Sequence, residues 1–149
     1  MTPGETTVAL VEQLTNEGVD HIVLLMRHSA REYAPGKHDL LNPLTDEGRD
    51  LARDMGKRLP KGLVVRGYTS PAERCVETAG LIMSGHAAAG GHILRNRVVE
   101  ALGVFYVLDQ MKMFKSMRDA GGIVSFLQRW FDGRIARDIL MPADLAARL

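Results

Sequence analysis

A run of five apolar residues from Ile22 to Met26, followed at once by Arg27 and His28, constrains the fold of this chain most strongly. An uninterrupted apolar run of this length is typical of a strand buried on both faces, as in parallel sheets covered by helices. Ligands of open α/β sheets bind beyond the carboxyl ends of the strands. The polar turn therefore predicts an anion site, with phosphate as the first candidate, in which Arg27 and Arg31 flank the His28 imidazole.

The rest of the chain predicts an alternation of helices and strands. We expect helices over residues 7–17 and 45–59, a strand over 63–65, a helix from Ser70 onward, and a strand over 93–99 that ends at Glu100. Thr45 is the expected N-cap of the second helix. Ser70, Pro71 and Glu73 match a capping box at the start of the third helix. This order predicts an α/β fold, a three-layer sandwich with a mostly parallel sheet.

Two other regions complete the predicted organisation. The segment 29–43 is a loop long enough to fold back over the site at His28. From residue 105 the pattern is helical and apolar, with Gly121 and Gly122 between two helices, and Pro142 begins a last helix over 143–149. We interpret residues 1–149 as one domain and residues 105–141 as a helical insertion or lid within it.

Composition narrows the function classes. The net charge of the 149 residues is +1, so the sequence gives no reason to expect nucleic acid as a partner. No apolar run is long enough for a membrane span, and the first twenty residues do not form a secretion signal. The lone Cys75 lacks a disulfide partner, and metal-type cysteine spacing is absent. We expect a cytoplasmic protein that needs no metal and no cofactor.

Arg74 is expected to join the site at His28. It lies in the first turn of the predicted third helix, and helical side chains lean back toward the N-terminus of their helix. If the strands 22–26 and 63–67 are parallel neighbours joined by the helix 45–59, the two side chains emerge at the same edge of the sheet. Two distant parts of the sequence then form one pocket.

Three segments resemble the histidine phosphatase superfamily, which includes phosphoglycerate mutases and acid phosphatases: Arg-His-Ser-Ala-Arg at 27–31, Asn-Pro-Leu-Thr-Asp-Glu-Gly at 42–48, and Ser-Pro-Ala-Glu-Arg-Cys-Val-Glu-Thr-Ala at 70–79. The similarity covers roughly residues 22–103. Ser29 replaces the glycine that usually follows the nucleophilic histidine. The spacing from Arg27 to Arg31 is similar to the acid phosphatase branch and the helix at 70–79 to the mutase branch, so the branch stays open.

The resemblance implies two-step phosphoryl transfer through a phosphohistidine on His28. A neutral imidazole is a nucleophile at pH 7, provided that its other nitrogen is held by a hydrogen bond. Arg27, Arg31 and Arg74 would bind the phosphoryl oxygens through charge-assisted hydrogen bonds. Glu100 is the candidate proton donor to the leaving group. By the same resemblance Asn42 contacts the small phosphorylated substrate.

The resemblance also requires a second histidine on a later strand. The sequence has no histidine after residue 103, and His86 and His92 come too early to replace it. We therefore expect an incomplete domain that lacks its C-terminal strand unit. Its exposed sheet edge would favour a homo-oligomer or pairing with a complementing C-terminal segment.

Three functions remain open at this point. The first is hydrolysis of a phosphomonoester through phosphorylated His28, in which this chain alone is expected to have little or no activity because the second histidine is absent. The second is a phosphoglycerate mutase-like phosphotransferase that uses the same histidine. The third is a non-catalytic module that binds a phosphorylated ligand. Cys75 is not assigned a catalytic role, because the arginine that cysteine phosphatases place six residues later is absent: position 81 is Leu.

Overall fold

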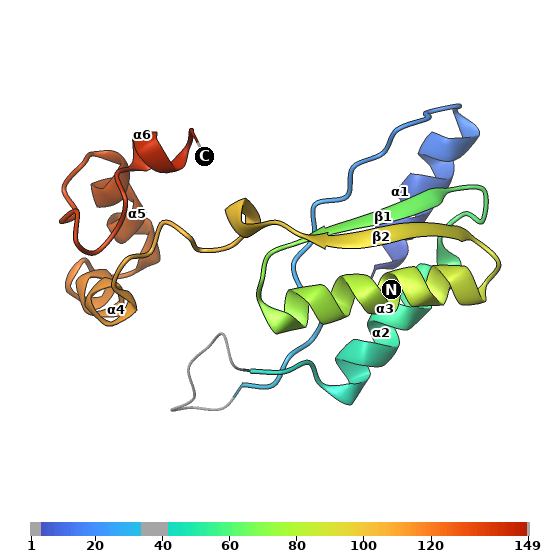
Figure 1. Ribbon diagram of the computed structural model, residues 1–149, viewed down its shortest axis with the longest axis horizontal. Helices are drawn as coiled ribbons and strands as arrows, with labels where there is room; N and C mark the ends of the chain where they lie inside the picture. The colour runs from blue at the N-terminus through green and yellow to red at the C-terminus, as the bar shows by residue number, and fades with distance from the viewer. Residues whose placement is uncertain (1–3, 34–41, 149) are drawn as a thin grey trace. The chain divides into compact units, whose positions relative to one another are not determined.

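The computed structural model describes residues 4–33 and 42–148, which divide between two compact units, Met1–Leu102 and Gly103–Leu149 (Figure 1). The elements of the first unit are α1 (Glu5–Asn16), α2 (Asp46–Arg58), β1 (Val64–Thr69), α3 (Glu73–Ala88), β2 (His92–Val98) and the 3₁₀ helix η2 (Glu100–Leu102). The second unit contains α4 (Gln110–Asp119), α5 (Ile123–Phe131) and α6 (Ala143–Ala146). Residues 34–41 of the predicted covering loop 29–43, His38 among them, lie outside the described residues. The role of residues 105–141 as an insertion or lid stays a prediction.

The sheet of the first unit is a parallel pair, β1 and β2, joined by α3. The register pairs Val64 with His92 and Thr69 with Val98, with one irregularity between Val65 and Gly67. Figure 1 shows α3 running along the two strands, against which it packs. In such a βαβ unit the carboxyl ends of both strands lie at the same edge of the sheet. The structure thus confirms the α/β class with a parallel sheet.

An apolar core joins α1 to α2. Val8 and Val11 on α1 are buried in one cluster with Met55 and Leu59 from the end of α2. Partly buried apolar residues around it come from four other positions: Ile22, Leu63, Val65 and Ile82. Burial of one aliphatic side chain stabilises a fold by about 1.5–3 kcal/mol. This cluster therefore fixes α1 and α2 to the first residues of β1.

The backbones of α2 and α3 approach each other closely because each helix has a glycine at the contact. Gly56 of α2 lies against the carbonyl oxygen of Ile82, and Gly85 of α3 lies against that of Arg53. A Cβ atom added to either glycine would overlap with the facing oxygen. The two helices can hold this spacing only while both positions lack a side chain.

The capping signals of the sequence were right for α2 and wrong for α3. The Thr45 hydroxyl accepts a hydrogen bond of 3.0 Å from the Gly48 N–H, as an N-cap does. The α3 helix begins at Glu73 with Ala72 as N-cap, and it has no side-chain cap. Ser70 therefore lies before the helix start. The extended backbone of Ala72 delays the helix beyond the position that the capping-box pattern predicts.

The strand predicted at 22–26 is not formed. In the described part of the chain these residues make no backbone hydrogen bonds, and Val23 and Leu25 are 93% and 95% exposed. A strand needs a hydrogen-bonded neighbour, and an apolar run is buried only where other elements cover it. Only Ile22 packs against the core. The homo-oligomer or complementing C-terminal segment expected from an exposed sheet edge stays a prediction.

The second unit is a small helical structure around one tryptophan. The Trp130 ring on α5 stacks on Tyr106 with 4.9 Å between the ring centroids, and its indole N–H donates to the carbonyl oxygen of Met141 at 2.7 Å. As the sequence predicted, Gly121 and Gly122 separate α4 from α5; in the structure both have positive φ angles, of 80° and 125°. No helix of the described residues is long and apolar enough to cross a membrane.

Candidate active site

The turn after His28 docks on the first two turns of α3 through one hydroxyl group. The backbone N–H of Ser29 donates to Thr78 Oγ1 at 3.0 Å, and this hydroxyl donates in turn to the carbonyl oxygen of Arg74 at 2.7 Å. Thr78 and Arg74 are both buried. The segment of His28 and the helix of Arg74 therefore meet, although they are more than forty positions apart in the sequence.

The His28 ring is held in one tautomer by its neighbour. Its Nδ1 lies 2.8 Å from the carbonyl oxygen of Ser29. A carbonyl oxygen only accepts hydrogen bonds, so Nδ1 carries the hydrogen, and the neutral ring has its free electron pair on Nε2. The ring is half-buried. Its Nε2 has the electronic state that a nucleophile requires.

The chain after Ser29 is fixed to the start of α2. The Ala30 carbonyl accepts a hydrogen bond of 3.1 Å from the Thr45 N–H, and the Pro43 carbonyl accepts one of 2.9 Å from the Glu32 N–H. A Cβ on Gly48 would overlap with the Ala30 carbonyl oxygen. Gly48 thus lets the segment after His28 pass directly over the first turn of α2.

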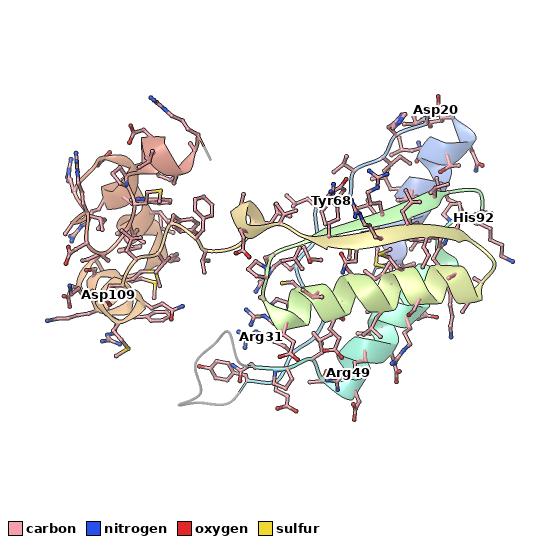
Figure 2. The ribbon with its side chains drawn as sticks, in the orientation of Figure 1. Asp20, Arg31, Arg49, Tyr68, His92 and Asp109 are labelled. Carbon is pink, nitrogen blue, oxygen red and sulfur yellow. The ribbon has the colours of Figure 1, made fainter. Side chains whose placement is uncertain are left out.

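An ion pair ties α2 to α3 beside this junction. Arg49 Nε donates to Glu77 at 2.6 Å, and Arg49 Nη1 donates to Asp46 at 3.0 Å. The hydrogen bond to Glu77, followed by that to Asp46, raises the pKa of the Arg49 guanidinium above its usual value. Figure 2 shows Arg49 and Arg31 at the same end of the first unit. The ion pair between Arg49 and Glu77 holds α2 and α3 together near the residues that position His28.

Arg74 and Asn42 are the most enclosed of the predicted site residues. Arg74 is 8% exposed, in the first turn of α3, and Asn42 is 3% exposed. The Asn42 side-chain oxygen makes no hydrogen bond with the residues that the structure describes. Thr69, at the end of β1, is also buried, and its hydroxyl has no such partner either. Thr69 and Arg74 are thus buried polar residues at the carboxyl end of β1 and in the first turn of the helix that follows it, where a ligand of an α/β sheet binds.

The remaining predicted residues are more open. Arg27 is exposed. Arg31 Nη1 donates to the Glu32 carbonyl at 3.1 Å, and its guanidinium lies 6.0 Å from the centre of the Tyr33 ring. These contacts direct Arg31 toward its own loop. The predicted phosphate-binding roles of Arg27 and Arg31 stay predictions.

Glu100 lies two residues after the end of β2 and is exposed at the start of η2. The Val99 N–H donates to the Thr69 carbonyl at 2.8 Å, so the pairing of the two strands continues up to this point. Glu100 therefore lies at the same edge of the sheet as the loop that leads from β1 into α3. Its role as proton donor stays a prediction.

Neither of the two later histidines lies near this edge. His86 is in the last turn of α3, completely buried, with Nε2 3.0 Å from the carbonyl oxygen of Leu63. Twelve helical residues from Arg74 to His86 correspond to about 18 Å. His92 begins β2, and Figure 2 shows it at the opposite end of the sheet from Arg31. Both histidines thus lie away from the carboxyl edge of the sheet.

Thr78 is the positioning residue that the sequence analysis did not assign. It lies within the segment 70–79 that carries the resemblance, four positions after Arg74. A threonine on the same helix face as a candidate phosphate ligand is the signal that could have identified it, because residues i and i+4 are neighbours on a helix.

We predict that Thr78→Val, which keeps the shape but removes the hydroxyl, lowers the free energy of unfolding by about 1–2 kcal/mol. The Ser29 N–H would lose its acceptor in a partly buried position. The matched control is Thr78→Ser, which retains the hydroxyl. Urea denaturation followed by circular dichroism measures both. Equal midpoints for the valine and serine variants would contradict the bridging role of this hydroxyl.

Comparison with known proteins identifies the class. A family model described as histidine phosphatase superfamily (branch 1) matches residues 23–115, which is more than half of the chain. The chain belongs to this superfamily, which connects it with phosphoryl transfer of the phosphatase or mutase kind. The branch that the motifs left open is branch 1 in this match. Neither the curated proteins nor the solved structures contain a match.

Proposed function

We propose that this chain carries the nucleophilic half of a phosphomonoester hydrolase that works through a phosphohistidine on His28. The observation that carries the proposal is the hydrogen bond of 2.8 Å between His28 Nδ1 and the carbonyl oxygen of Ser29. In the neutral ring this hydrogen bond leaves the electron pair on Nε2. Membership of the superfamily supports phosphoryl transfer in general.

In the first step, Nε2 of His28 attacks the phosphorus atom and the bond to the ester oxygen breaks. The leaving alkoxide takes a proton, for which Glu100 is the candidate donor. In the second step, water attacks phosphorus, the P–N bond breaks, and inorganic phosphate and neutral His28 are released. The proton from that water returns to the acid–base residue. Each step transfers one phosphoryl group, and the His28 ring returns to its starting state only after the second step.

Positive charge at the carboxyl edge of the sheet supports both steps. Arg74 is buried one helical turn before Thr78, which anchors the His28 segment. A guanidinium is permanently charged and binds phosphoryl oxygens in a fork. We assign Arg74 and the exposed Arg27 to the equatorial oxygens, where charge develops in the transition state. The N-terminus of α3 adds a partial positive charge at the same edge.

The test is turnover of p-nitrophenyl phosphate, with release of phosphate measured separately. The expected result is formation of a phosphorylated chain, with slow turnover, because the second histidine of the superfamily is absent from this sequence. Incubation with phosphoglycerate isomers distinguishes the mutase alternative, which would interconvert them without net release of phosphate. Binding of phosphate without any phosphorylated chain would favour the non-catalytic module and contradict the proposal.

A further inference from the structure

The face of the sheet that points away from α3 has an unusual combination of side chains. Gly67 and Thr69 of β1 are buried, and a Cβ on Gly67 would touch the sulfur of Met83 on α3. Successive residues of a strand point to opposite faces. Arg66 and Tyr68 therefore lie on the face opposite α3, and Figure 2 shows Tyr68 on that side of the strands.

The same argument places two arginines of β2 on this outer face. The side-chain amide of Asn96 donates to the Val76 carbonyl of α3 at 3.3 Å, so Asn96 faces the helix and its neighbours face away. Arg97 pairs with Tyr68 in the register. Arg66, Arg95 and Arg97 line one shallow depression together with Leu94. Three guanidinium groups thus gather on one side of a two-stranded sheet.

Among the described residues, these three arginines have no acidic partner. The ion pairs of the described residues involve none of the three arginines. Arg66 instead donates to the Tyr68 hydroxyl at 3.1 Å. This hydrogen bond, with further contributions from the charges of Arg66 and Arg97, lowers the pKa of the Tyr68 phenol below its usual value. The outer face therefore favours negatively charged groups.

The face is also apolar. Val64 and Tyr68 are 59% and 50% exposed, and Leu94 is 44% exposed. Parallel sheets are normally covered by helices on both faces, and here α3 covers one. A helix with an apolar stripe would cover the second face, and acidic residues beside the stripe would meet the three arginines. A small anion would satisfy the charge but leave the apolar surface exposed.

Three of the described helices, α1, α4 and α5, do not supply that complement. The acidic helix α1 already buries Val8 and Val11 in the core with α2. The α4 and α5 helices have the wrong charge: they carry Lys112, Lys115, Arg118 and Arg129 against Asp119.

We propose that the outer face of β1 and β2 is a docking surface for an acidic amphipathic helix of a partner protein. This surface is separate from the phosphoryl-transfer site, so the docking proposal does not depend on the role of His28. The three arginines provide the charge selectivity, and Val64, Tyr68 and Leu94 provide the apolar contact.

The test uses a fluorescently labelled synthetic helix with a leucine stripe flanked by glutamates, and measures binding to the full chain by anisotropy. The expected result is saturable binding that weakens as salt increases. The double variant Arg66→Glu, Arg97→Glu is expected to weaken binding about tenfold or more. The matched control is Lys57→Glu, which reverses an exposed charge on α2 and should leave binding unchanged. A peptide with lysines in place of glutamates should not bind.

The proposal is overturned if the glutamate peptide does not bind, or if it binds equally to the double variant. The face would instead be assigned to a membrane surface if anionic phospholipid vesicles bind the chain and the peptide does not. That binding would have to depend on Arg66 and Arg97 in the same way. Sedimentation that shows dimers of the wild-type chain and monomers of the double variant would assign it to a second copy. Circular dichroism of each variant checks that the fold is retained.

Discussion

His28→Ala is expected to abolish the phosphorylated form of the chain and to reduce hydrolysis of p-nitrophenyl phosphate by at least about 10³-fold. The physical reason is the loss of the only atom to which we assign attack on phosphorus, Nε2 of His28. In the neutral ring, the hydrogen bond to the Ser29 carbonyl keeps the hydrogen on Nδ1 and leaves the electron pair on Nε2, whereas a ring without this contact would exchange that hydrogen between its two nitrogens. Arginines alone would still bind phosphate but would form no covalent intermediate.

The measurement is the mass of the intact chain after brief incubation with substrate, because a phosphohistidine adds one phosphoryl group and is lost in acid. His92→Ala is the matched control, since His92 is exposed at the opposite end of β2. It should leave both phosphorylation and turnover unchanged. Turnover that survives in His28→Ala would remove the basis of the proposed function.

Features of the fold that depend on local chemistry could be predicted from the sequence. Thr45 caps α2 because its hydroxyl needs only a backbone N–H three residues later. Gly121 and Gly122 separate two helices because both positions take positive φ angles. Gly18 likewise follows α1 with a φ of 81°. Such signals act within a few residues, so no knowledge of the rest of the fold is needed.

Features that depend on distant partners could not be predicted in the same way. The apolar run from Ile22 to Met26 indicates what the segment would do when covered on both faces, but the structure leaves Val23 and Leu25 exposed. Ser70 has the composition of a cap, and yet α3 begins at Glu73. In both cases the prediction was wrong, because the local pattern alone does not determine whether the element forms where it is expected.

In the candidate site, too, some features could be predicted from the sequence and others could not. The residue types of His28 and Arg74 and their places at element ends were visible in the sequence. The link between them was not, because it passes through Thr78, whose hydroxyl joins the Ser29 N–H to the Arg74 carbonyl. A sequence motif names the groups that touch a ligand more readily than the groups that hold them in position.

The contact between α2 and α3 leads to the largest predicted effect on stability. Gly56→Ala and Gly85→Ala are each expected to lower the free energy of unfolding by about 3 kcal/mol. In each variant the new Cβ atom would overlap with a backbone carbonyl oxygen, of Ile82 or Arg53, and not with a flexible side chain that can move away. The helices would have to separate, which loosens the packing of the core.

Gly80→Ala provides the control within the same helix as Gly85. Gly80 is exposed, and a Cβ there would meet nothing within 4 Å. Alanine is favoured over glycine inside a helix by about 0.5–1 kcal/mol, so this variant should be slightly more stable than the wild type. Urea unfolding followed by circular dichroism gives the three midpoints. Glycine-to-alanine substitution is then expected to lower the free energy of unfolding at Gly56 and Gly85 and to raise it at Gly80. If Gly56→Ala or Gly85→Ala proved as stable as Gly80→Ala, the close approach of α2 and α3 would be wrong.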